Sequence, residues 1–147
     1  MPTDLVWSLI DDAWNSEISL EDVEATQARL NAMPAHVRHL YAATWIDCEV
    51  GNGGFWQLFS NSAGVLAPEA VDGFTALGMP QTAAIVAEAI NLLGSPFPRD
   101  RNVRDQRLSD LEDTCFDGLE DQFYTMIETE AGGSEEAFRT YAGRFAK

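Results

Sequence analysis

The segment CEVGNGGFWQLFSNSAG, residues 48–64, is a first candidate for chemistry, because a glycine-rich turn that opens a helix can bind phosphate. It matches neither the phosphate-binding loop that ends in Gly-Lys-Ser/Thr nor the Gly-x-Gly-x-x-Gly dinucleotide turn. A phosphate would also meet Asp47 and Glu49, with no Lys or Arg within ten residues of the glycines. The segment therefore predicts a joint before a short helix. Its aromatic residues enter the core, and Gln57 and Asn61 satisfy backbone groups of the turn.

Histidine and cysteine offer a second route to chemistry, through metal binding or nucleophilic catalysis. His36 and His39 are three residues apart, but no His-Glu-x-x-His or Cys-x-x-Cys motif accompanies them. We interpret both as neutral or surface histidines that flank Arg38. Cys48 and Cys115 have apolar neighbours, which indicates small buried hydrophobic side chains. Since no Gly-x-Ser-x-Gly nucleophile elbow occurs either, the sequence predicts a protein that is not an enzyme and holds no metal and no cofactor.

Carboxylates are the one chemical group in large excess. Twenty-four Asp and Glu face nine Lys and Arg, which gives a net charge of −15. This balance argues against direct binding to nucleic acid or to an anionic membrane surface, because both need a positive surface. It favours a cationic partner, such as a basic protein, a polyamine or a metal ion. The alternative is that the acidity serves only solubility or adaptation to salt.

The acidic residues are concentrated in residues 108–136, which contain ten acids and no base. On one continuous helix, five of them would fall on one side, and Asp110 and Glu128 would lie about 27 Å apart. Such a row of anions resembles the phosphates along a groove edge of DNA. We predict a partner-binding surface made of Asp110, Asp113, Asp117, Glu120, Asp121 and Glu128, with Asp4, Asp11 and Asp12 as a second row.

The elements that must position these groups are helical, because apolar residues recur at helical spacing and no strand-length alternation occurs. We expect an all-α fold, a single compact domain over residues 1–147 with seven or eight helices. The clearest apolar stripe covers residues 35–48 and ends at the glycines 51–54. Further helices are expected at 55–60, 68–77, 80–93 and 109–130 and from Ser134 onward, with residues 94–105 as a loop. No cationic leader and no membrane-length apolar run occurs, so we expect a cytoplasmic protein.

One string is specific enough to indicate a family: Glu49-x-x-Asn52-Gly53-Gly54-Phe55-x-Gln57-x-Phe59-x-Asn61. It resembles the E-x-x-N-G-G-F-x-Q-F-F-x-N signature of a bacterial all-helical domain, whose best-understood branch is the DNA mimic protein family. The resemblance covers roughly residues 35–95, and Trp56 and Leu58 replace more usual residues inside the motif. It implies a cytoplasmic homodimer whose acidic side chains imitate the phosphates of duplex DNA and occupy the cationic site of a DNA-binding protein. The motif itself is expected to set the fold rather than the mimicry.

Charge and resemblance together predict a non-enzymatic protein that mimics duplex DNA and binds the cationic site of a DNA-binding protein such as a transcription regulator. Three alternatives stay open. One is an immunity-type inhibitor that neutralises a basic toxin by the same complementarity. Another is an enzyme or small-ligand protein with a pocket near Trp45, Phe55 and Trp56. The last is a helical domain whose acidity is only an adaptation to its environment.

Overall fold

The computed structural model describes residues 4–16 and 19–146, and these residues form eight α-helices, two short 3₁₀ helices and no strand. The predicted all-α class and the predicted number of helices are confirmed. The α-helices are α1 (Asp4–Asn15), α2 (Val23–Ala32), α3 (Ala35–Ser60), α4 (Ala67–Ala76), α5 (Pro80–Leu92), α6 (Arg101–Ser109), α7 (Asp117–Thr129) and α8 (Ser134–Gly143). The 3₁₀ helices are η1 (Ser62–Leu66) and η2 (Glu130–Gly132).

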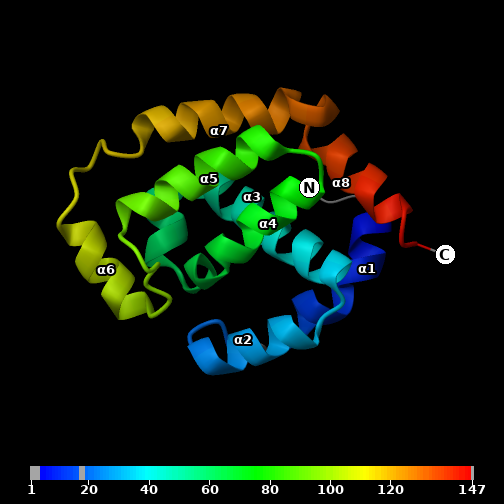
Figure 1. Ribbon diagram of the computed structural model, residues 1–147, viewed down its shortest axis with the longest axis horizontal. Helices are drawn as coiled ribbons and strands as arrows, with labels where there is room; N and C mark the ends of the chain where they lie inside the picture. The colour runs from blue at the N-terminus through cyan, green and yellow to red at the C-terminus, as the bar shows by residue number, and fades with distance from the viewer. Residues whose placement is uncertain (1–3, 17–18, 147) are drawn as a thin grey trace.

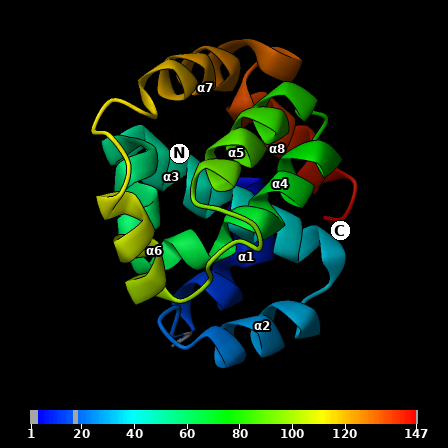
Figure 2. The ribbon, with the colours of Figure 1, turned by 60° about the vertical axis from the view of Figure 1, so that its left-hand side comes forward.

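The long helix α3 runs through the molecule, and the other helices are arranged around it (Figure 1). Helix α4 packs against α3, α5 packs against α4, and α7 packs against α5 on the outside. Helices α1 and α8 contact each other and α3, whereas α6 packs against α3 from another side and α2 lies at the edge of the molecule (Figure 2). The acidic helix α7 is thus an outer layer of the fold.

Helix α3 is interrupted at Gly53 and Gly54, where the sequence predicts a joint. Gly54 has a φ of 78°, a conformation that glycine adopts far more readily than other residues. A Cβ added there would lie 2.2 Å from Oε1 of Glu120, so the site also lacks room for a side chain. The predicted short helix that starts at Phe55 is therefore present as the second half of α3.

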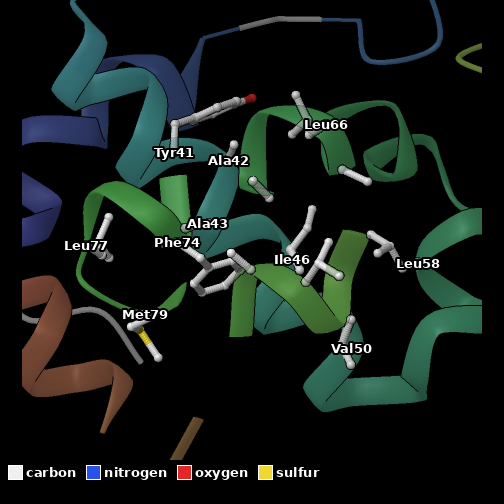
Figure 3. Packing of buried hydrophobic residues seen from close by; sticks show 14 of the residues in the cluster. Tyr41, Ala42, Ala43, Ile46, Val50, Leu58, Leu66, Phe74, Leu77 and Met79 are labelled. Atoms are coloured by element: carbon white, nitrogen blue, oxygen red, sulfur yellow. The ribbon is translucent and has the colours of Figure 1, made fainter. Parts of the chain in front are cut away.

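The aromatic residues after the joint enter the core, as predicted. Phe55 and Phe59 are 0% exposed, and the ring of Phe116 lies 5.9 Å and 5.7 Å from their rings. Figure 3 shows a neighbouring part of the same core, where Phe74 of α4 lies next to Ala43 and Ile46 of α3. Because both halves of α3 contribute to this core, the joint has a defined place in the fold.

Two predicted boundaries are wrong. Residues 94–105 are not one loop, because α6 begins at Arg101, where the carboxylate of Asp100 caps the helix by accepting from the N–H of Val103 at 3.1 Å. The many charged residues of α6 hide its apolar stripe, since one of its two buried side chains is an arginine, Arg104. Residues 109–130 are not one helix either, because α6 ends at Ser109 and α7 begins only at Asp117.

Candidate functional site

Three exposed carboxylates form a row along the outer face of α7: Asp117, Asp121 and Glu128. They are four and seven residues apart, so they share one side of the helix and follow one another at about 6 Å and about 10 Å along its axis. The opposite side carries Phe123, which is 1% exposed and whose ring lies 5.7 Å from that of Phe55. Burial of Phe123 therefore fixes the row, which we call the α7 row, toward solvent.

The surroundings of the α7 row extend the negative charge instead of neutralising it. No Lys or Arg occurs between Arg107 and Arg139. In the described part of the chain, the one ion pair formed by an acid of residues 108–136 joins Glu136 to Arg139. Eight of the ten acids in this segment are exposed: Asp110, Glu112, Asp113, Asp117, Asp121, Glu128, Glu135 and Glu136. Such uncompensated charge lowers stability through self-repulsion, so it is a feature that calls for a function.

The other two acids of the segment bind backbone groups inside the protein. Glu120 is half-buried, and its Oε1 accepts a hydrogen bond of 2.9 Å from the N–H of Phe55. Glu130 accepts from the N–H groups of Gln81 and Thr82, both at 2.8 Å, and so caps the start of α5. Both contacts join residues far apart in the sequence, and no local pattern in the sequence indicates them. The structure therefore turns Glu120, a predicted partner-binding residue, toward the interior.

Asp110 and Asp113 do not continue the α7 row as one helix. Asp110 is the C-cap of α6, and Asp113 lies in the turns between α6 and α7. The expectation of one helical row from Asp110 to Glu128 is wrong for this reason, because the chain changes direction before Asp117 (Figure 1). Both side chains are nevertheless exposed.

The predicted second row lies on α1. Asp4, Asp11 and Asp12 are all exposed, while Val6 and Ile10 of the same helix are 0% exposed. Helix α1 packs against α3 and α8, and α8 lies between α1 and α7 (Figure 2). The two acidic rows are therefore on separate helices with α8 between them.

Two amide side chains of the motif at the joint, Gln57 and Asn61, bind the carboxylate of Glu49. Oε2 of Glu49 accepts hydrogen bonds from Nε2 of Gln57 at 3.0 Å and from Nδ2 of Asn61 at 3.1 Å. The prediction that these two amides serve backbone groups of the turn is thus wrong, because they bind across the joint to Glu49. Gly53 makes this possible, since a Cβ there would lie 1.9 Å from Oε1 of Gln57. The motif thus links both halves of α3 through side chains.

Both histidines contact aromatic side chains of the protein, and neither cysteine is fully buried. Nδ1 of His39 lies 3.0 Å from the hydroxyl of Tyr141, and the ring of His36 stacks on Phe145 at 4.2 Å. The prediction that both cysteines are buried is wrong for Cys48, which is exposed because it lines an open pocket on the surface of α3, and Cys115 is partly exposed. Partial burial raises the pKa of both thiols, which keeps them protonated and weakly nucleophilic.

The aromatic residues of the alternative enzyme hypothesis pack against other rings. Trp45 stacks on Trp14 with ring centroids 4.5 Å apart, and Trp56 meets Phe116 edge to face at 6.3 Å. Phe55 is 0% exposed, so its ring is unavailable to a ligand. These three residues thus contribute to the core and its rim.

The comparisons with known proteins give one match. The family model described as DMP19-like protein matches residues 31–143, which include the joint in α3, the motif and the whole α7 row. No curated protein and no solved structure matches the chain. None of the helices in residues 4–16 and 19–146 combines the length and apolar character needed to cross a bilayer.

Proposed function

The chain belongs to the DMP19-like protein family, and from this premise we propose that it is a non-enzymatic DNA mimic. In this proposal its carboxylates stand in for the phosphates of duplex DNA and occupy the cationic site of a DNA-binding protein such as a transcription regulator. As the family resemblance implies, it acts in the cytoplasm as a homodimer. Membership of the family supports the fold of this chain. The proposed function is argued from the charged surface residues, because proteins of one fold can differ in function.

The α7 row is the observation that carries the proposal. Asp117, Asp121 and Glu128 present three charges over about 16 Å of helix, and acids at both ends of α7 continue the negative surface. One strand of DNA carries one charge per about 3.4 Å of its axis, so the helix imitates a groove edge at lower charge density. Lys and Arg side chains that neutralise phosphates would meet these carboxylates instead.

The net charge of −15 supports the same proposal through association kinetics. Opposite charges steer two proteins together and can raise association rates by 10-fold to 1,000-fold at low salt. The affinity is then expected to fall steeply as salt screens the pair, with a screening length near 8 Å at 0.15 M.

Affinity capture from a lysate at low and high salt tests the proposal. The bait proteins are the wild type, a row variant carrying Asp117→Asn, Asp121→Asn and Glu128→Gln, and a control variant carrying Glu24→Gln, Asp72→Asn and Asp105→Asn. The control removes three exposed charges from α2, α4 and α6, so both variants have the same net charge. We expect the wild type and the control to retain a DNA-binding protein at low salt and the row variant to lose it.

Three results would contradict the proposal in different ways. If no DNA-binding protein is retained at low salt, the mimic function is wrong. Equal loss in both variants would show that net charge acts without the α7 row. Retention of a toxin nuclease in place of a regulator would favour the immunity-type inhibitor.

A further inference from the structure

A polar pocket of about 740 Å³ lies between α3 and the start of α8, outside the α7 row. Three carboxylates line it, those of Asp47, Glu49 and Glu135, together with polar side chains such as Asn52 and Ser134. No Lys, Arg or His is among its lining residues. The pocket therefore concentrates negative charge in a concave site, where a cation is attracted more strongly than on an open surface.

The carboxylate of Glu49 is held in place by neutral donors. Gln57 and Asn61 both donate to Oε2, which fixes the carboxylate while leaving its negative charge unneutralised. Oε1 receives no hydrogen bond from the described residues. A carboxylate that two amides orient, with one oxygen still open, is prepared to accept from an incoming N–H donor.

Thr44 supplies an independent sign of an absent ligand. It is 1% exposed, it lines the same pocket, and its hydroxyl oxygen has no hydrogen-bond partner in the described structure. Thr44 lies three and four residues before Asp47 and Cys48, so it shares their side of α3. Buried hydroxyls are nearly always hydrogen-bonded, and an unpaired one therefore indicates a missing partner.

Asp47 is the third element of the site. Burial raises the pKa of its carboxyl group. A positive charge placed beside Asp47 would stabilise its ionised form and relieve this cost.

The size of the pocket decides the kind of cation. In residues 4–16 and 19–146, no three His, Cys, Asp or Glu side chains are close enough to share one metal ion. The volume also exceeds what a single ion needs, and the carboxylates come from two helices. A ligand with several carbons and terminal N–H donors meets both conditions.

We propose that this pocket binds an extended organic ammonium ion, with Asp47, Glu49 and Glu135 as its counter-charges and Thr44 as an uncharged acceptor. Two sources share this chemistry: a free polyamine, or a lysine side chain of another protein. The proposal goes beyond the DNA mimic function and does not depend on it.

Titration with spermidine and, separately, with Nα-acetyl-lysine-N-methylamide at 0.15 M NaCl tests the proposal, by calorimetry and by amide chemical shifts. We expect shifts in residues 44–52 and at Ser134, and a dissociation constant about 10-fold higher in an Asp47→Asn, Glu135→Gln variant. An Asp117→Asn, Asp121→Asn variant is the matched control, because it removes two acids outside the pocket. Its affinity is expected to stay within about 2-fold of the wild type.

Thr44→Val is a second variant that separates ligand binding from folding. It replaces the unpaired hydroxyl with a methyl group of the same shape, so we expect weaker ammonium binding without a loss of stability. Binding of spermidine alone would assign the pocket to a polyamine, and binding of the lysine compound would assign it to a protein side chain. The proposal is overturned if neither compound binds, or if the pocket variant and the α7 control lose affinity equally, since that would be diffuse charge attraction.

Discussion

At the scale of the residue, the least expected feature is a buried arginine with no carboxylate partner. Arg104 is 0% exposed, and its guanidinium donates to the carbonyls of Phe59 and Asn61, both at 2.9 Å, and to that of Arg99. Burial lowers the pKa of this side chain to about 10. Arg104 thus satisfies the carbonyls at the end of α3, a task that a fork of N–H donors can perform.

We expect Arg104→Met to lower the free energy of unfolding by about 3 kcal/mol, because the carbonyls of Phe59 and Arg99 would lose their donor while staying covered, and that of Asn61 would keep only the N–H of Gly64. Removing the buried positive charge would by itself raise the free energy of unfolding, but the substitution leaves these carbonyls without their donor. Urea unfolding of the variant beside Arg29→Met, a control at an exposed position, measures the difference. A loss no larger than that of the control would show that Arg104 has no such role.

His39 is expected to make stability depend on pH. Burial, and then the charge of Arg38, lower the pKa of His39 below its ordinary value of 6.5. The unfolded chain therefore takes up a proton first, so the stability due to His39 is complete above pH 6.5 and is lost progressively as the pH falls below 6.5 toward the lowered pKa of the folded state. Relative to His39→Gln, the wild type should be less stable at pH 5.5 than at pH 7.5, and parallel urea midpoints at both pH values would contradict this.

At the scale of the element, neighbouring acids of α7 have different tasks. Glu120 serves the interrupted helix α3 by binding the N–H of Phe55, whereas Asp121 is exposed in the α7 row. Asp121 also lies beside a groove between α5 and α7, with Glu88 nearby. One helix thus supports the fold with one side chain and presents charge with the next.

This division gives a matched pair of variants. Glu120→Ala should lower the free energy of unfolding by about 1 to 2 kcal/mol, because the N–H that starts the second half of α3 loses its acceptor. Asp121→Ala should change it by less than about 0.5 kcal/mol and weaken capture of the partner instead. Thermal or urea unfolding combined with capture separates the two effects, and equal effects on both readouts would refute the assignment.

Local patterns predicted the helices wherever their apolar residues keep a helical period. The joint at Gly53 and Gly54 and the burial of Phe55 were predictable from residue types alone. Helix α6 was missed because Arg104 occupies a core position, where a charged residue reads as surface. The sequence could not place Glu120 or Glu130, because their partners are 65 and 48 residues away and only the tertiary fold brings them together.

At the scale of the whole molecule, the distribution of charge matters more than its total. The core orients α7 so that its acids face solvent, and no basic residue of the same segment neutralises them. The ion pairs of the described residues, Arg99–Glu69, Arg101–Glu21 and Arg139–Glu136, use other acids. Because these arginines pair with acids outside the α7 row, the three carboxylates of the row have no ion-pair partner among the described residues and can attract a cationic partner.

Competition with DNA tests whether the α7 row takes the place of duplex DNA on the partner. A fluorescent duplex is bound to the DNA-binding protein retained from the lysate, and the wild-type chain, the row variant or the charge-matched control is added at low salt. We expect the wild type and the control to displace the duplex, while the row variant needs at least about 10-fold higher concentration, since it lacks three charge-assisted contacts. A wild-type chain that binds the partner and leaves the duplex in place would contradict DNA mimicry, and a row variant that displaces the duplex equally well would contradict the role of the α7 row.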